Sequence, residues 1–197
     1  RPVVWHMTHS EVMREGTLAL VDTDPNVLKT MMALGERVIA ATDAPTKLVG
    51  STNRREVLRD ADFIVLTFSD RNAHHRGLDC KVSLEHGVRM CSGDTIGPGG
   101  VFRALREIPK ALQMAQDAEE LAPDAWMINF VNPTSVLGIA LMRYSQMRSF
   151  AICDGLHEPR YRLRTLKTVG LLPEDADTVP PEMEAKLDLR TDRKSVV

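Results

Sequence analysis

Short apolar runs alternate with segments of helical spacing along most of this chain. The runs that predict strands are Thr17–Val21, 63–68, 126–131 and 150–153. One predicted helix begins near Pro25, with Thr23 or Asp24 as its cap. Further helices are predicted over 55–60, 101–121 and 134–143. This alternation predicts an α/β fold, a parallel sheet with helices on both faces.

The remaining segments give weaker signals. A short apolar run at 38–41 precedes an expected loop that contains Asp43, Pro45 and Gly50. Polar residues dominate 69–85, which predicts loop or mixed structure, and Pro109 is expected to interrupt or kink the 101–121 helix. The proline-rich, acidic stretch 173–184 reads as a loop or connector.

Composition is that of an ordinary globular protein. The chain has 197 residues, 43% hydrophobic and 26% charged, with a net charge of −2, so nothing in its charge favours nucleic acid or a membrane surface as a partner. Its apolar runs are too short to cross a membrane. Three cysteines, Cys80, Cys91 and Cys153, lack metal-site spacing and predict thiols in a reducing cytoplasm. We therefore expect a cytoplasmic protein with a small-molecule substrate.

Polar side chains follow three of the predicted strands. Asp22 could bind the ribose hydroxyls of a dinucleotide or simply cap the next helix. Asn129 lies near the end of the third strand and Asn132 follows it, and the Asn132 amide suits a sugar hydroxyl, although Asn-Pro turns also occur without function. Cys153 ends the last predicted strand, and Asp154 follows it. Because ligands bind at the carboxyl ends of parallel strands, these residues predict an active site there.

A glycine-rich segment, Asp94-Thr95-Ile96-Gly97-Pro98-Gly99-Gly100, precedes the long helix. It is either a simple turn or a place where the backbone approaches a ligand closely. The dinucleotide-binding signature Gly-x-Gly-x-x-Gly is absent from the printed sequence.

Three segments in this order, 93–100, 129–133 and 152–154, resemble the glycoside hydrolases of family 4, which cleave glycosidic bonds with NAD and a divalent metal. The resemblance covers about 18–160 and implies a Rossmann-like fold, with NAD and Mn as cofactors. It assigns Asp22, Thr95 and Asn129 to the cofactor and Asn132 and Arg71 to the glycoside substrate. It also implies that Cys153 binds the metal and that Asp154 is the catalytic acid.

The chain departs from the family pattern in several places. The family's metal-binding histidine, in a Gly-x-Asn-His segment, and its catalytic tyrosine have no match here, and neither His157, Tyr144 nor Tyr161 replaces them. Arg71 and Arg76 lie where the family often has Arg-x-Gly-Gly, but the glycines are missing. A phosphorylated sugar is therefore an open question, as are the sugar and its anomeric form.

The same resemblance predicts the organisation of the chain. We expect a partial NAD-binding domain over 1–155, the start of a C-terminal catalytic domain over 156–191, and a tail over 192–197 that resembles a translated sequencing adapter. The first strand, with its glycine turn, and most of the C-terminal part would then be missing. Such a fragment would be inactive, whereas the full-length enzyme would be a homo-oligomer.

The implied reaction is a hydrolysis by redox steps, elimination and addition, which does not need the usual carboxylate pair. Two other functions remain open. A lactate or malate dehydrogenase-like enzyme would share the fold and an Asn-Pro after a comparable strand, but not the Cys-Asp. A nucleotide-binding regulatory module without catalysis is the third possibility.

Overall fold

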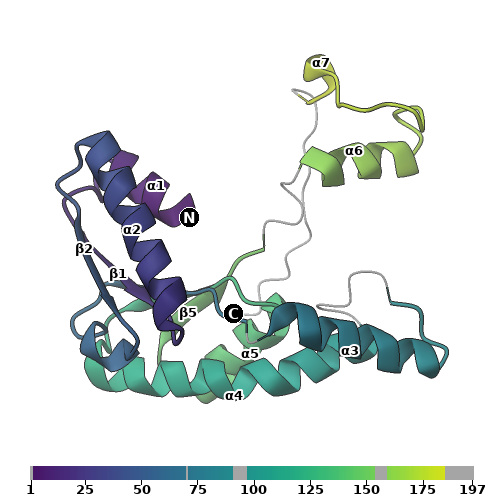
Figure 1. The fold of residues 1–197 in the computed structure, drawn as a ribbon. Helices are drawn as coiled ribbons and strands as arrows, with labels where there is room; N and C mark the ends of the chain where they lie inside the picture. Colours follow the sequence, from purple (N-terminus) through teal and green to yellow (C-terminus); the bar gives the residue numbers. More distant parts are fainter. Residues whose placement is uncertain (1, 70, 91–96, 154–158, 185–197) are drawn as a thin grey trace. The chain divides into compact units, whose positions relative to one another are not determined.

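The computed structural model describes residues 2–69, 71–90, 97–153 and 159–184 (Figure 1). Its helices are α1 (Pro2–His9), α2 (Pro25–Thr42), α3 (Asn72–Glu85), α4 (Gly97–Leu121), α5 (Thr134–Tyr144), α6 (Pro159–Thr168) and α7 (Pro181–Glu184), with a short 3-10 turn η1 (Arg54–Glu56). Its strands are β1 (Thr17–Val21), β2 (Lys47–Ser51), β3 (Phe63–Leu66), β4 (Trp126–Asn129) and β5 (Arg148–Ala151). None of the described helices is long and apolar enough to span a membrane.

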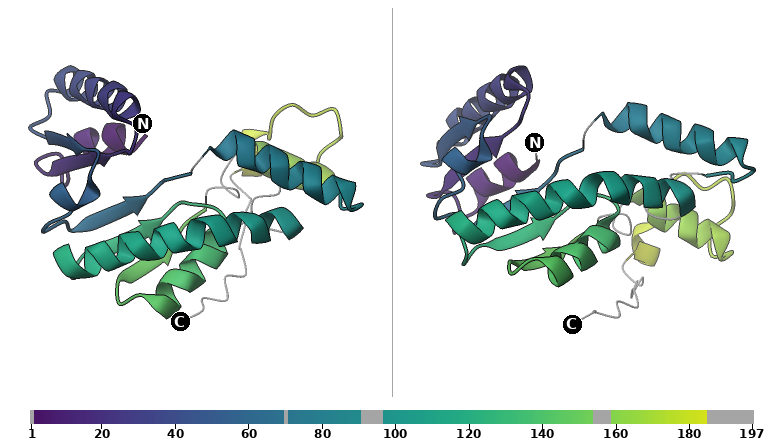
Figure 2. Two further views of the ribbon diagram at one scale, coloured as in Figure 1. Left: turned by 60° about the horizontal axis from the view of Figure 1, so that its bottom comes forward. Right: turned by 90° about the horizontal axis from the view of Figure 1, so that it is seen from below.

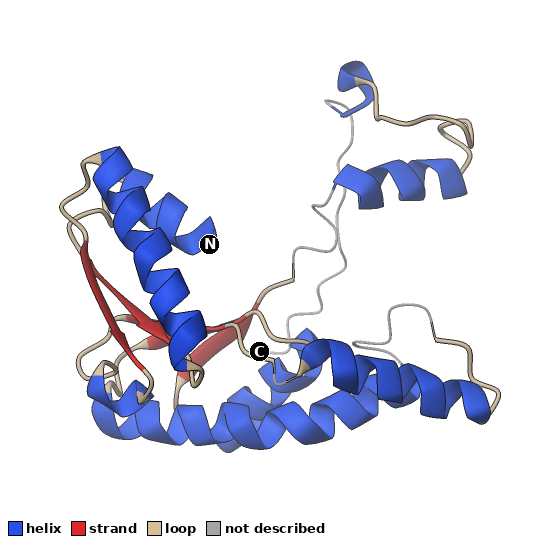
Figure 3. Ribbon diagram, in the orientation of Figure 1, coloured by secondary structure: helices blue, strands red, loops and turns tan. Residues whose placement is uncertain are grey.

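The described strands form two parallel sheets, one of β1 and β2 and the other in the order β3-β4-β5 (Figure 3). The predicted α/β fold with parallel strands is thus confirmed. In the second sheet Phe63 pairs with Trp126 and Trp126 with Arg148, so the carboxyl ends of all three strands lie at one edge.

One face of the three-stranded sheet is packed and the other is exposed. The packed face lies against α4 and α5, which run side by side (Figure 2). The core there consists of Leu66, Ala111, Ala115, Ala118, Ala122, Ala125, Met127, Val131, Leu137, Leu141 and Met147. The opposite face leaves Phe63 61% and Phe150 43% exposed.

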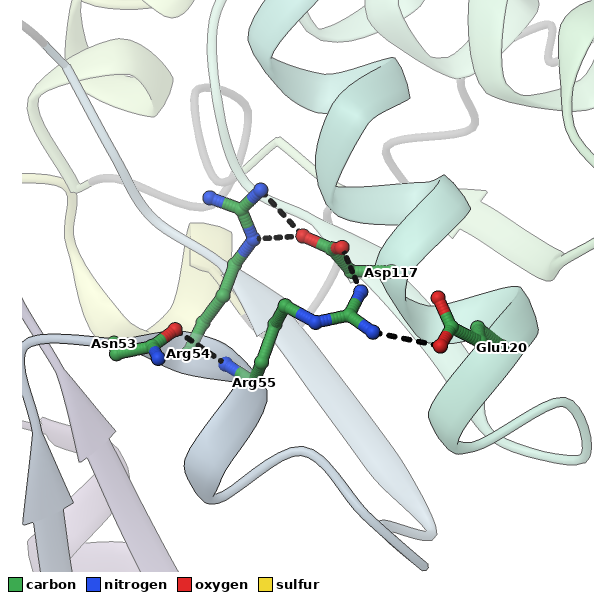
Figure 4. Close-up of polar contacts among 5 residues, drawn as sticks. All are labelled: Asn53, Arg54, Arg55, Asp117 and Glu120. Carbon is green, nitrogen blue, oxygen red and sulfur yellow. Dashed lines mark hydrogen bonds and ion pairs between the residues drawn. The ribbon is translucent and has the colours of Figure 1, made fainter.

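Ion pairs join the two sheets through the segment that follows β2. Arg54 and Arg55 of η1 both bind the Asp117 carboxylate on α4, and Arg55 also reaches Glu120 at 2.7 Å (Figure 4). The Asn53 side chain accepts a hydrogen bond from the Arg55 N–H at 3.2 Å and so orders this turn. Nearby, the Asp60 N–H donates to the Leu121 carbonyl at 3.2 Å. These contacts connect the β1–β2 sheet to the helix that covers β3–β5.

Several expected elements differ from the structure. The run 38–41 lies inside α2, and the expected loop around Gly50 is strand β2. The predicted helix over 55–60 is only the turn η1, and the stretch 69–85, interpreted as loop or mixed, contains helix α3. The helix around Pro109 continues through the proline from Gly97 to Leu121. At the far end, 173–180 is irregular and α7 follows it.

The chain divides into two compact units, Arg1–Ile152 and Cys153–Val197. In the second unit, α6 ends in a turn where Leu171 and Leu172 both donate backbone hydrogen bonds to the Leu166 carbonyl. Lys167 caps the same turn by donating to the Glu174 carbonyl at 2.7 Å. The functional identities expected for 1–155, 156–191 and 192–197 remain predictions.

Candidate functional site

The carboxyl end of β4 carries Asn129, whose side chain is fully buried. Its Nδ2 donates to the Val131 carbonyl at 3.1 Å and lies 3.5 Å from the Thr134 carbonyl, while its Oδ1 accepts from the Val131 N–H at 3.0 Å. These bonds fold the chain between the end of β4 and the start of α5. The amide's visible role is thus to shape the loop, and its contact with NAD remains a prediction.

Asn132 occupies the loop that Asn129 shapes. It is half-buried, and its Oδ1 accepts a hydrogen bond from the Thr134 hydroxyl at 2.8 Å. The peptide bond between Asn132 and Pro133 is cis, and α5 begins at the next residue, Thr134. The loop therefore holds the Asn132 amide just ahead of a helix N-terminus, beyond the carboxyl end of β4.

Cys153 lies two residues beyond β5 and is exposed. The Ile152 N–H donates to the Asn129 carbonyl at 2.9 Å, so β4 and β5 remain paired up to the residue before the thiol. An exposed thiol at a strand end is accessible to a metal ion, which binds the deprotonated form. Asp154, the predicted acid, lies outside the described residues.

Asp22 follows β1 and is half-buried. Its Oδ1 accepts from the Asp24 N–H at 2.9 Å, and Asp24 in turn caps α2 by accepting from the Asn26 N–H at 2.8 Å. Asp24 is therefore the helix cap, and Asp22 braces the turn that leads into it. A strand-end carboxylate is the group that binds a ribose diol, so the cofactor role of Asp22 stays a prediction. Thr95 lies outside the described residues.

Arg71 immediately precedes α3, with an exposed side chain and a left-handed backbone, φ 42°. Next to it is a small polar pocket between α3 and α4. Its lining residues are Ser69, Asn72, His75, Arg76, Asp79, Arg103, Arg106 and Glu107. Arg71 itself does not line the pocket, so its contact with substrate remains a prediction.

Two ion pairs stabilise the wall of this pocket. Arg106 forms a two-pronged ion pair with Asp79, at 3.0 and 2.6 Å, and this hydrogen bonding raises the pKa of the Arg106 guanidinium. Glu107 is 2% exposed and pairs with Lys110 at 3.4 Å. Sequence reasoning missed the Asp79–Arg106 pair because 27 residues separate its members. Only recognition of α3 as a helix packed on α4 could have suggested it.

The described residues do not assemble a metal site by themselves, because they contain no group of three or more histidine, cysteine or acidic side chains suited to a metal ion. Cys153 is the one predicted metal ligand. The metal-binding role of Cys153 therefore remains a prediction.

Solved structures with the same fold include both glycosidases and dehydrogenases. A 6-phospho-α-glucosidase from gut microorganisms, determined in complex with NAD and Mn²⁺, is 21% identical, with a TM-score of 0.70 over 85% of this chain and 37% of its own. Lactate dehydrogenase from Cryptosporidium parvum is 12% identical, with a TM-score of 0.60 over 86% of this chain and 46% of its own. These likenesses define the class, an α/β chain with a Rossmann-like fold.

The sequence comparison goes beyond the fold. The model of the family 4 glycosyl hydrolases matches residues 1–169, so the chain belongs to this family. The 6-phospho-β-glucosidase of Escherichia coli is 36% identical over 128 residues, which make up 64% of this chain and 28% of that enzyme. The chain thus spans less than a third of the length of that relative. The predicted family is confirmed, and a lactate or malate dehydrogenase is the less supported alternative.

Proposed function

We propose that this chain forms the Rossmann-like part of a glycosidase that hydrolyses O-glycosidic bonds with NAD and a divalent metal, manganese being the expected ion. The observation that carries the proposal is the family match over residues 1–169. The positions of Asn132 and Cys153 at the carboxyl ends of neighbouring strands support it. In the cell we place the enzyme in the cytoplasm as a homo-oligomer that binds neither nucleic acid nor membranes.

The residues of this chain fit the ribose of NAD better than its pyrophosphate. Asp22 offers a half-buried carboxylate at a strand end, suited to the vicinal hydroxyls of the ribose. No Gly-x-Gly-x-x-Gly turn exists in the printed sequence to bind the pyrophosphate with backbone amides. We therefore expect the 197-residue chain alone to bind NAD weakly.

The proposal of a metal site rests on a single ligand among the described residues. Cys153 would contribute a thiolate, and the other ligands must come from outside the described residues, because these contain no cluster that could hold the ion. A thiolate ligand makes binding dependent on pH, since the thiol must lose its proton.

Substrate contacts are proposed for Asn132 and Arg71. The Asn132 amide can both donate to and accept from a sugar hydroxyl, and its position is fixed by the Thr134 hydroxyl on one side and Pro133 on the other. The exposed Arg71 guanidinium could meet an anionic sugar, such as a sugar phosphate. Asp154, as the proposed acid, would protonate the leaving oxygen.

The test is hydrolysis of 4-nitrophenyl glycosides by the complete gene product, measured with and without NAD and Mn²⁺. The panel comprises α- and β-glucosides and galactosides, each with and without a 6-phosphate, because the sugar and its anomeric form are open. We expect hydrolysis of at least one glycoside, dependent on both additions. Hydrolysis that survives a chelator and the removal of NAD would refute the proposal, as would a lactate or malate dehydrogenase activity.

A further inference from the structure

Helix α3 is attached to the first unit chiefly through α4, and the buried part of this attachment is polar. Among the described elements, α4 is the one against which α3 packs most (Figure 1). The apolar core of the three-stranded sheet contains no residue of α3. The residues of α3 that are buried, Asp79 and Ser83, are both polar. The position of α3 relative to the sheet therefore depends strongly on its polar contacts with α4.

Two arginines of α4, one helical turn apart, supply such contacts. The Arg106 guanidinium donates to both carboxylate oxygens of Asp79, at 3.0 and 2.6 Å. Arg103 is only 8% exposed, and its guanidinium donates to the Ser69 hydroxyl at 3.5 Å. A planar guanidinium fixes the orientation of a two-pronged partner as well as its distance. Helix α4 thus holds the chain at residue 69 and again at residue 79.

Arg71 lies between these two points of contact. It occupies the cap position of α3, where its carbonyl accepts from the His75 N–H at 3.0 Å, while its side chain forms no capping hydrogen bond. Its backbone is left-handed, with φ 42°. A residue with a Cβ rarely adopts this conformation, which persists where the surrounding structure holds it in place. The contacts of Ser69 and Asp79 with α4 provide that support on either side of Arg71.

We propose that Arg103 and Arg106 are positioning residues, which hold Arg71 in the orientation in which it contacts the substrate. This inference rests on the proposed function, because it takes the substrate contact of Arg71 from there. Arg71 follows β3 and Asn132 follows β4, and the carboxyl ends of these two paired strands lie at one edge of the sheet. Both proposed substrate contacts therefore come from the same edge, and α4 fixes the one that follows β3.

Steady-state kinetics of the complete gene product test whether Arg103 acts through Arg71. The substrate is the glycoside of the panel that the parent hydrolyses best. Arg103→Met should raise KM about fivefold or more and leave kcat within about twofold, as should Arg71→Ala. Adding Arg103→Met to Arg71→Ala should raise KM no further, because the group that Arg103 positions is already absent.

Two further variants separate positioning from loss of folding. Arg106→Lys keeps a positive charge beside Asp79 but not the two-pronged geometry, so KM should also rise even if Arg103→Met does not fold. Arg54→Met is the matched control, because Arg54 also pairs with a carboxylate of α4, Asp117 (Figure 4). Asp117 lies about 20 Å further along the helix than Arg103. The control should leave KM unchanged.

Hydrogen–deuterium exchange, measured by mass spectrometry, tests the same contacts without turnover. Exchange over 72–79 should be faster in Arg103→Met and Arg106→Lys than in the parent and in Arg54→Met. Exchange over β1 and β2 should stay as in the parent, which shows that the variants remain folded.

Several outcomes would overturn the proposal. A KM for the double variant that equals the product of the two single effects would mean that Arg103 acts independently of Arg71. An unchanged KM in Arg71→Ala or in Arg103→Met would overturn the positioning role while leaving the glycosidase proposal intact. If the parent hydrolyses no glycoside, the proposed function fails separately. Equal exchange over 72–79 in the parent, Arg103→Met and Arg106→Lys would then overturn the positioning role as well.

Discussion

At the residue scale, the buried Asn129 side chain gives the clearest stability prediction. Its three polar contacts, with Val131 and Thr134, shape the loop after β4. Asn129→Ala leaves the Val131 N–H and two carbonyls without these partners. We therefore expect the free energy of unfolding to fall by about 2 kcal/mol. Urea denaturation measures this change.

Asn132→Ala is the matched control for Asn129→Ala, because it removes the same amide from a half-buried position in the same loop. We expect it to reduce stability by less than half as much, while substrate affinity in the complete enzyme falls. If both variants lose the same stability, the loop does not depend on Asn129 as described.

Asp117 provides a pH-dependent prediction. Burial alone would raise the pKa of its carboxyl, but hydrogen bonds donated by Arg55 and Arg54 outweigh burial and hold the pKa below its usual value. Since the folded-state pKa is lowered, the stabilisation is complete above the unfolded-state pKa of about 3.9 and is lost as pH falls through the folded-state pKa. Asp117→Asn should lower the free energy of unfolding by about 1 kcal/mol at pH 7 and by progressively less below about pH 4.

Urea midpoints of the parent chain and Asp117→Asn at pH 7, 5, 4 and 3.5 measure the Asp117 effect. Glu120→Gln is the control, since Glu120 also pairs with Arg55 but its side chain is 64% exposed. A difference between parent and Asp117→Asn that stays constant over this pH range would contradict the account.

Local signals determined which residues could be predicted. The sequence offered Thr23 or Asp24 as the cap of α2, and Asp24 is the cap, a role that could be narrowed to two residues because a capping residue lies beside the helix it caps. The alternative that Asp22 caps the helix is wrong, since Asp22 accepts from the Asp24 N–H instead. The Arg54 and Arg55 pairs to Asp117 span more than sixty residues of sequence, and no spacing rule connects them. The sequence alone therefore could not predict side-chain roles that depend on tertiary contacts.

At the scale of elements, helices α3 and α4 depend on the Asp79–Arg106 ion pair. Asp79 is 8% exposed and the Arg106 side chain is 29% exposed, so removing Asp79 leaves a partly buried guanidinium without this partner. We expect Asp79→Leu to lower the free energy of unfolding by about 2 kcal/mol or more. The double variant Asp79→Leu with Arg106→Met should recover most of that loss. A double-mutant cycle by urea denaturation measures the coupling, and purely additive losses would contradict it.

Pro109 tests how α4 tolerates a residue that normally breaks a helix. It lies inside α4 with an exposed side chain, and it lacks the N–H that would continue the ladder. Pro109→Ala should therefore stabilise the chain by about 1–3 kcal/mol, seen as a higher thermal midpoint. An unchanged or lower midpoint would show that the helix has adapted to the proline.

Elements were predicted best where their hydrophobic period was strong. β1 matched its predicted bounds, and α5 was correct to within one residue. Helix α3 was missed because its residues are polar around most of its surface, and β2 because a glycine interrupts a five-residue run. Both elements are fixed by packing, α3 on α4 and β2 on α2, rather than by their own sequences.

At the scale of the whole molecule, the ordered motifs identified the family, while composition supported only a globular α/β chain. The family match confirms the family identification, and the parallel strands confirm the α/β fold class. The division of the described strands into two sheets was not foreseen, because strand order depends on contacts between distant segments. The roles of Asn132, Cys153 and the other site residues remain proposals that measurement must decide.

The Mn²⁺ activation curve of the complete gene product tests the central claim most directly, namely that the strand-end site contains the metal ligand Cys153. The curve is recorded for the parent, for Cys153→Ser and for Cys80→Ser, whose half-buried thiol lies on α3. We predict that Cys153→Ser weakens Mn²⁺ activation of glycoside hydrolysis by about tenfold or more, with Cys80→Ser unchanged. An unaltered curve for Cys153→Ser would contradict the account.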